Sequence, residues 1–239
     1  MAADPDPLGA DALLRPVRFG NAFEDTVARL LATVRLGMLR PGDRLPPERE
    51  LAVRLGVSRD TVREAIKSLS EAGYLVARRG RYGGTFLAER LPTPTGGTAG
   101  VTAEEISDVL RLREILEVGA ARMAAARRLS TAERDGLRAR LADVRAAGAE
   151  DYRRLDSRLH LAFAEAADSP SLVPLVAENR MRINALLDRI PLLPRNIDHS
   201  EQQHEAIVEA ILAGDPDGAA AAMLAHLAGS AALLHGFLD

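Results

Sequence analysis

The sequence predicts a mainly α protein with an N-terminal winged helix-turn-helix and a C-terminal all-α antiparallel bundle of six or seven helices. Three observations lead to this fold class. Residues 19–91 contain short helical patterns and then an alternating segment, residues 92–100 form a Pro/Gly/Thr stretch, and residues 101–239 show helical patterns only. We therefore expect two domains joined by a linker, and a disordered N-terminal tail over residues 1–18.

Composition limits the class of protein. A chain of 239 residues, 47% of them hydrophobic, can bury a sizeable core, and the absence of cysteine excludes disulfides and thiolate metal sites. The N-terminus has acids and prolines where a signal peptide has an apolar stretch, and no run approaches the roughly 20 apolar residues of a membrane span. We expect a soluble, cytoplasmic protein with no membrane partner.

The net charge of −3 conceals an asymmetry between the two segments. Residues 19–91 hold 13 Lys and Arg against 9 Asp and Glu, whereas residues 92–239 hold 16 against 22. Only the first segment carries the positive excess that suits a polyanion such as nucleic acid.

The first segment predicts three helices. Apolar residues at helical spacing place the first over residues 20–37. The second is short, with Pro47 in its first turn and Gly56 at its left-handed end. Ser58 can cap the third, which runs to Gly73. Two short helices joined by the few residues around Gly56 form a helix-turn-helix.

The pattern then changes from helical to alternating. In GYLVARRGRYGGTFLAER, strand-like residues stand on either side of a basic, glycine-containing turn at residues 79–84. We predict a small β-hairpin with a basic tip, the wing of this domain.

Cations recur every four residues along the third helix, at Arg59, Arg63 and Lys67. Such spacing usually marks a solvated helix face, which is the simpler interpretation. In a helix-turn-helix, however, cations near the start of the second helix reach phosphates and guanine edges in the major groove. Arg59 and Arg63 lie one turn apart and can enter one groove, whereas Lys67 is placed to meet backbone phosphate or solvent.

The segment LPPERELAVRLGVSRDTVREAIKSLSEAGYLVARRGRYGGTFL closely resembles the winged helix-turn-helix of GntR-type bacterial transcription regulators. The resemblance implies binding to double-stranded DNA at a palindromic operator, with contacts from Arg49, Arg59, Thr61, Arg63, Arg79 and Gly80. Two positions depart from the family pattern. Pro47 replaces a serine and removes a capping oxygen, and Asp60 stands where a threonine is common. We expect Asp60 to accept from a cytosine amine or to pair with a neighbouring arginine.

The second segment predicts helices over residues 102–128, 131–147, 150–167, 170–189, 199–213 and 216–237. Capping boxes start the first two: Thr102 with Glu105, and Ser130 with Glu133. Pro170 and Pro216 sit where a first helical turn tolerates proline. A break at Pro174 would make seven helices instead of six. An antiparallel bundle follows.

Four side chains in this bundle have the spacing of a metal site. Asp156 and His160 are four residues apart and project from one helix face. His204 and His226 each lie eleven residues from Asp215, the centre of the AGDPDG turn, so they stand level in an antiparallel hairpin. Such a carboxylate and imidazole set suits zinc, nickel, manganese or iron better than calcium. The simpler interpretation is that the histidines are packed or surface residues.

The segments DVLRLREILEVGAARMAA, DSRLHLAF and QHEAIVEAILAGDPDGAAAAMLAHL are together similar to the helical effector domain, FCD, of the FadR subfamily of GntR regulators, over residues 102–235. This resemblance implies that the four residues just named bind a divalent transition metal, zinc before nickel, manganese or iron. It also implies a small carboxylic acid effector beside the metal. Arg113 is the candidate partner of that acid, and a structural pair with Glu117 is the alternative.

These features predict a ligand-responsive DNA-binding transcription regulator, by family habit a repressor, working as a homodimer. Metal and acid would favour one arrangement of the bundles, which sets the spacing of two winged domains on two half-sites. Two other classes stay open: a constitutive DNA-binding protein whose bundle only dimerises, and a metal-dependent hydrolase. No enzyme activity is predicted, since no further base or paired carboxylate has a recognisable spacing.

Overall fold

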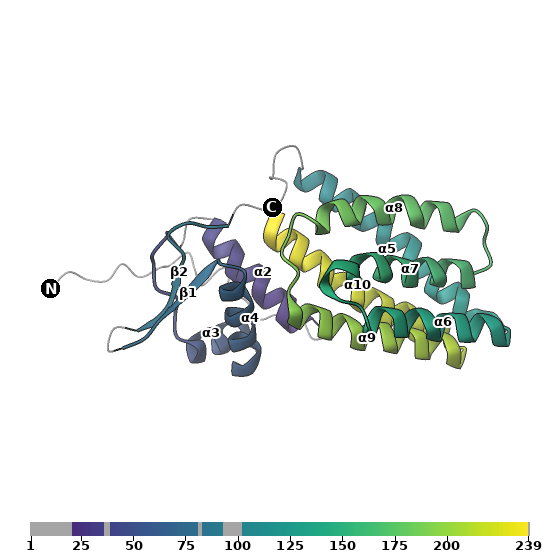
Figure 1. The fold of residues 1–239 in the computed structure, drawn as a ribbon, viewed down its shortest axis with the longest axis horizontal. Coiled ribbons are helices and arrows are strands. Elements are labelled where there is room, and N and C mark those ends of the chain that lie inside the picture. Colours follow the sequence, from purple (N-terminus) through teal and green to yellow (C-terminus); the bar gives the residue numbers. More distant parts are fainter. Residues whose placement is uncertain (1–20, 36–38, 81–82, 93–101, 239) are drawn as a thin grey trace.

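The computed structural model describes residues 21–35, 39–80, 83–92 and 102–238. The expected disordered tail lies outside this part of the chain, as does nearly all of the expected linker. Figure 1 shows the N-terminal helices and hairpin gathered at one end, while the later helices run side by side along the long axis. The predicted fold class, a winged helix-turn-helix followed by an all-α bundle, is confirmed.

The N-terminal lobe contains a helix-turn-helix and a two-stranded wing. Its elements are α2 (Ala22–Arg35), α3 (Glu48–Leu55), α4 (Arg59–Glu71), β1 (Leu75–Arg78) and β2 (Gly84–Leu87). The strands pair antiparallel, with Leu75 opposite Leu87. Gly56 ends α3 with a φ of 66°, and the Ser58 hydroxyl accepts from the Thr61 amide at 3.0 Å to cap α4. Pro47 precedes α3 without a side-chain cap, as its replacement of serine predicted.

The C-terminal lobe is a bundle of six helices within the described residues: α5 (Ala103–Ala126), α6 (Thr131–Arg145), α7 (Ala149–Ala166), α8 (Leu172–Leu187), α9 (Pro194–Ala213) and α10 (Pro216–Leu238). Both capping boxes form. Pro170 lies before α8, not in its first turn, and Pro174 is the third residue of that helix. A proline there replaces an amide that has no partner inside the helix, so α8 does not break.

Helix α9 begins five residues earlier than predicted, at Pro194 instead of residue 199. The sequence PRNID has no apolar period, and this hid the first turn. Pro194 is suited to the first position of a helix because no intrahelical partner is needed there. Ile197 packs in the same apolar cluster as Ile207 and extends the buried face of α9 by one turn.

The two lobes share one apolar core. Residues of α2, α4 and β1 form a single buried cluster with the ends of α8 and α10, and the rings of Tyr74 and Phe237 meet edge to face at 5.5 Å. Helix α2 approaches α10 so closely that a Cβ on Gly236 would stand 2.8 Å from Cα of Ala28. The first helix of the N-terminal lobe therefore rests directly on the last helix of the bundle (Figure 1).

Helix α10 corrects the expectation that no segment is apolar enough for a membrane. It is 23 residues long, and by length and composition alone it is apolar enough to cross a membrane. Its neighbours α2, α5 and α9 explain that composition. Met223, Leu234 and Phe237 are buried against them, as in the core helix of a soluble protein.

Candidate metal centre and nucleic-acid interface

The structure brings the four candidate metal ligands together. Asp156 and His160 come from α7, His204 from α9 and His226 from α10, and all four are buried. One ligand atom of each lies within 4.8 Å of those of the others. Nε2 of His204 is 3.3 Å from Nε2 of His160 and 3.3 Å from Oδ1 of Asp156.

The α9–α10 turn explains how two of these histidines meet. Gly214 ends α9 with a φ of 72°, and the carboxylate of Asp215 accepts from the amide of Gly218 to begin α10. The helices return antiparallel from this turn, and the rings of His204 and His226 face each other with centroids 4.4 Å apart.

Charged residues surround the cluster. Nδ1 of His160 lies 2.7 Å from Oε2 of Glu117 on α5. Oε1 of Glu117 accepts from Nε of Arg113 at 3.3 Å. On α8, Arg180 donates through Nη2 to Oδ2 of Asp156. The two arginines and two carboxylates are all buried and balance one another in charge.

The sequence patterns did not single out Arg180 as a residue of this site. It lies on the buried face of α8 with Val176 and Ile183, and only 2% of its surface is exposed. The signal was present in the sequence: a cation on the apolar stripe of a helix needs a buried partner. The spacing alone did not reveal that this partner is Asp156, 24 residues earlier.

Burial and the surrounding charges set the protonation of Asp156, His160 and His226. Burial lowers the pKa of His160 to about 4, against an opposing effect of Glu117, and it lowers the pKa of His226 well below its usual value. Burial would raise the pKa of Asp156, but Arg180 and then His160 hold it well below its usual range. At neutral pH the cluster therefore offers the carboxylate of Asp156 and the neutral imidazoles of His160 and His226.

This donor set fits a divalent metal ion. Two imidazole nitrogens and a carboxylate oxygen converge within 3.7 Å of one another, and Nδ1 of His204 has no hydrogen-bond partner among the described residues. Buried lone pairs that face one another need a proton or a cation between them. Three imidazoles and one carboxylate are ligands typical of zinc and other first-row transition metals.

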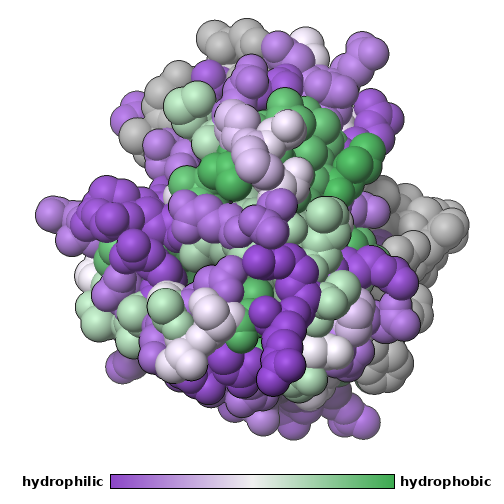
Figure 2. Space-filling model, turned by 90° about the vertical axis from the view of Figure 1, so that its right-hand side faces the viewer, coloured by the Kyte–Doolittle hydropathy of each residue, from purple (hydrophilic) through white to green (hydrophobic). Residues whose placement is uncertain are grey.

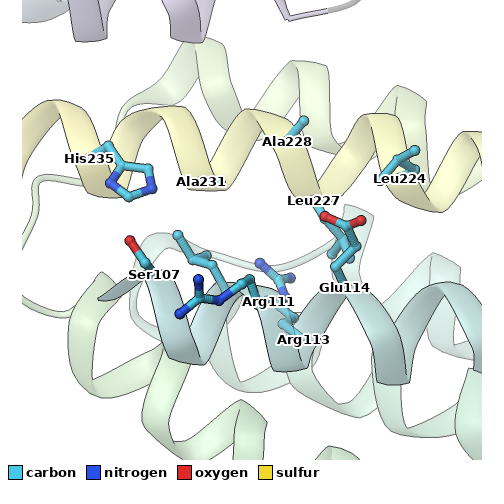
Figure 3. Close-up of a pocket in the computed structure, with 10 residues that line it drawn as sticks. Ser107, Arg111, Arg113, Glu114, Leu224, Leu227, Ala228, Ala231 and His235 are labelled. Carbon is cyan, nitrogen blue, oxygen red and sulfur yellow. The ribbon is translucent and has the colours of Figure 1, made fainter. Parts of the chain in front are cut away.

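Arg113 connects the cluster with a surface groove. Figure 3 shows this groove between α5 and α10, with Ser107 and Arg111 on one side and His235 on the other. Its volume is about 300 Å³, and Arg113 lines it. Besides its bond to Glu117, Arg113 donates through Nη1 to the Ser230 hydroxyl at 2.7 Å. Arg113 thus forms the expected pair with Glu117, and it also lines the groove from which a ligand could reach it.

The predicted nucleic-acid contacts lie on the helix-turn-helix and the wing. All are exposed except Thr61, which is half-buried; the exposed ones are Arg49, Arg59, Arg63, Arg79 and Gly80. Arg63 donates through Nη1 to Oδ1 of Asp60 at 3.0 Å, and its Nε is 3.5 Å from Oε2 of Glu48. Of the two expected roles of Asp60, pairing with a neighbouring arginine is therefore the one seen in this structure.

The wing presents its basic tip beyond the paired strands. Arg78 at the end of β1 stacks over the ring of Phe86, 4.6 Å from its centroid. Arg79 follows and is exposed, and Gly80 has a φ of 105°, which favours glycine. The tip can therefore approach a polyanion through Arg79 and the glycine backbone.

Comparisons with known proteins define the class. The model of bacterial regulatory proteins of the gntR family matches residues 23–87, and the FCD domain model matches residues 108–229. The chain belongs to the GntR family of bacterial transcription regulators, in the FadR-like group with an FCD domain.

Individual relatives agree with this assignment. An Escherichia coli K12 protein, provisionally named the L-lactate dehydrogenase operon regulatory protein, is 31% identical over 90% of this chain and 86% of its own length. The Bacillus subtilis 168 HTH-type transcriptional regulator LutR is 29% identical over 86% of this chain and 98% of its own length. The solved structure of E. coli McbR/YncC, 20% identical, covers 89% of this chain and 96% of its own with a TM-score of 0.52, which supports the fold. The first two relatives are named as regulators, and the hydrolase alternative is set aside.

Proposed function

We propose that this protein is a cytoplasmic transcription repressor that binds a palindromic operator as a homodimer and releases it when a small carboxylic acid binds beside a metal ion. The observation that carries this proposal is the buried Asp/His cluster with two buried arginines at its edge. A constitutive DNA-binding protein has no need of such a cluster, because buried charge is costly and apolar side chains would suffice for dimerisation.

The metal would be held by Asp156, His160, His204 and His226. Zinc suits three imidazoles and a carboxylate, whereas nickel, manganese or iron would accept further ligands more readily. When bound, the ion supplies a Lewis acid that attracts a carboxylate oxygen. Glu117 and Arg180 position two of the ligands, by contacting His160 and Asp156 respectively.

A carboxylate is the expected effector on grounds of charge. Arg113 and Arg180 are balanced by Glu117 and Asp156, so a divalent ion would leave a buried excess of positive charge. An anion neutralises that excess, and the guanidinium of Arg113 can donate charge-assisted hydrogen bonds to it from the wall of the groove. L-Lactate is the first acid to test, because the E. coli relative is named for an L-lactate dehydrogenase operon.

The homodimer is proposed from exposed apolar side chains on the bundle. Ile115 on α5 is 71% exposed and Met181 on α8 is 67% exposed. Figure 2 shows apolar residues gathered on the end of the bundle that faces away from the winged domain. A second copy would cover exposed apolar side chains such as Ile115 and Met181, and two winged domains would then read two half-sites.

The experiment that tests the function combines three measurements on purified protein. Metal content is determined for wild type and for His226→Ala, with His235→Ala on the same helix as the matched control. Thermal shifts are then recorded with L-lactate and other small acids, and DNA affinity is measured with and without each acid. We expect about one metal ion per chain, lost only in His226→Ala, and at least one acid that weakens DNA binding. Unchanged DNA affinity with every acid would instead support the constitutive alternative.

A further inference from the structure

A chain of hydrogen bonds links the metal cluster to the first helix of the winged domain. Nδ1 of His226 is 3.2 Å from Oε1 of Gln203 on α9. Nε2 of Gln203 donates to Oδ1 of Asn21 at 2.9 Å, immediately before α2. Nδ2 of Asn21 in turn donates to the carbonyl oxygen of Ala225 on α10 at 2.8 Å. Three helices therefore meet through two amide side chains.

The direction of this chain follows from its fixed end. The Ala225 carbonyl can only accept, so Asn21 directs its nitrogen there and its oxygen toward Gln203. Gln203 must then donate to Asn21 and accept from His226, which places the proton of His226 on Nδ1. Nε2 of His226 is left with its lone pair, and a neutral imidazole nitrogen is the form that binds a metal.

We propose that Asn21 and Gln203 are positioning residues of the metal centre, through which the DNA-binding domain holds His226 in its metal-binding tautomer. The inference rests on the proposed function for its ligand set and goes beyond it by naming the path between sensor and DNA-binding domain. Outer hydrogen bonds of this kind fix the tautomer and ring orientation of metal-bound histidines.

The packing around Asn21 makes this link sensitive to the position of α2. Asn21 is 8% exposed, and a Cβ on Gly229 would stand 2.9 Å from its Oδ1. Asn21 therefore sits against the backbone of α10 only three residues from His226. A shift of α2 along α10 would break both hydrogen bonds of Asn21 and release Gln203. The affinity of the site for metal is therefore coupled to the position of the winged domain. Such coupling is reciprocal: zinc must change DNA affinity by the same factor as DNA changes zinc affinity.

A second contact between the same helices offers a matched control. Glu24 on α2 accepts from Nδ2 of Asn196 at 2.9 Å and contacts Nδ1 of His199 at 2.9 Å, both on α9. The bond from Asn196 to Glu24 also holds α2 against the bundle, and neither residue belongs to the path from Asn21 through Gln203 to His226. Asn196→Ala therefore weakens the docking of the two lobes without interrupting the chain to His226.

The test uses the full-length protein with zinc as the probe and a DNA fragment selected for binding to wild type. Zinc affinity is measured by competition with a chromophoric chelator, and DNA affinity with and without zinc. We expect Gln203→Ala to weaken zinc binding about tenfold or more. Asn21→Ala should also weaken zinc binding, and both variants should reduce the effect of zinc on DNA affinity. Asn196→Ala and the exposed neighbour Gln202→Ala should leave the coupling within about twofold of wild type.

Two further measurements keep the proposal falsifiable if Asn21→Ala folds poorly. Asn21→Asp still accepts from Gln203 but cannot donate to Ala225, so it should restore part of the zinc affinity lost in Asn21→Ala. In zinc-loaded wild type, the Nδ1 proton of His226 should be visible by NMR and protected from exchange, and this protection should be lost in Gln203→Ala.

One contrary result is that Asn21→Ala binds zinc as tightly as wild type and keeps the full effect of zinc on DNA affinity. That result would overturn the link from Asn21 through Gln203 to His226 and leave the proposed sensing function intact. A wild-type protein with no tight zinc site, or with DNA affinity indifferent to both zinc and acids, would overturn the function and the link together.

Discussion

Asp156 divides its two carboxylate oxygens between two partners: Oδ1 faces the nitrogen of His204, and Oδ2 accepts from the guanidinium of Arg180. The guanidinium keeps the carboxylate ionised in a buried position, which is the state that a metal ligand requires. Arg180 thus prepares the site for a cation although it is itself positively charged.

Replacement of Arg180 by methionine tests this arrangement. The variant leaves Asp156 buried without its counter-charge, and the loss of one partner of a buried pair costs about 3–5 kcal/mol of unfolding free energy. Zinc should restore more stability to this variant than to wild type, because the ion supplies the missing positive charge. Urea unfolding with and without zinc measures both effects.

Arg182→Met is the control for that experiment. Arg182 lies on the same helix but is 45% exposed and pairs with Asp108 at 3.5 Å. An exposed pair of this kind contributes at most about 1 kcal/mol, so this variant should remain close to wild type. Equal destabilisation of the two variants would contradict the role assigned to Arg180.

The metal-free protein should lose stability as the pH falls. The pKa of His160 is lowered to about 4 and that of His226 is also lowered, so below about pH 6.5 the unfolded chain binds more protons than the folded one. Each such histidine costs up to about 1.4 kcal/mol per pH unit in this window. The pKa of Asp156 is lowered too, and its contribution is lost only at lower pH.

Urea unfolding of metal-free protein between about pH 7 and pH 5 checks this prediction. His160→Gln should flatten the dependence of unfolding free energy on pH, whereas Gln202→Ala, which removes no titratable group, should keep the wild-type slope. An unfolding free energy that is constant across the range would show that the buried histidines do not titrate as the structure implies.

The role of Asp60 on the recognition helix can be tested by charge removal. Asp60 holds the guanidinium of Arg63 at 3.0 Å and adds a negative charge beside the expected phosphate contacts. Asp60→Asn should raise affinity for non-specific DNA and steepen its salt dependence by up to about one counterion. Glu71→Gln, an exposed acid at the other end of α4, should change neither quantity. Titration of labelled random-sequence DNA at several salt concentrations would compare the two variants with wild type.

The sequence was sufficient to predict most helix bounds, the wing and the two pairs of candidate ligands, because each depends on local spacing. Capping boxes, glycine stops and the equal distances of His204 and His226 from Asp215 are all read within one or two elements. Arg180 and the Asn21–Gln203 contact depend on how distant helices pack. No local pattern encodes those partners, and the sequence could not identify them.

Arg113 can be tested for its two roles separately. Arg113→Lys keeps a cation beside Glu117 but loses the planar fork that binds a carboxylate in two places. The variant should fold and bind zinc with about wild-type affinity, while the acid that releases wild type from DNA should act about tenfold more weakly. If acid sensitivity is unchanged and only thermal stability falls, Arg113 is a structural partner of Glu117 and the acid binds elsewhere.

Two glycines in the bundle should respond oppositely to alanine. A Cβ on Gly236 would stand 2.8 Å from the backbone of Ala28, so Gly236→Ala must push α2 away from α10 and should cost about 1–3 kcal/mol of unfolding free energy. Gly119, in the middle of α5, has nothing within 4 Å, and Gly119→Ala should stabilise by about 0.5–1 kcal/mol through helix propensity. Urea unfolding of both variants gives the comparison. Because Gly236→Ala displaces α2 from α10, where Asn21 donates to the Ala225 carbonyl, it should also weaken the effect of zinc on DNA affinity, while Gly119→Ala should preserve it. A neutral Gly236→Ala with full coupling would show that α2 is not held against α10 in solution.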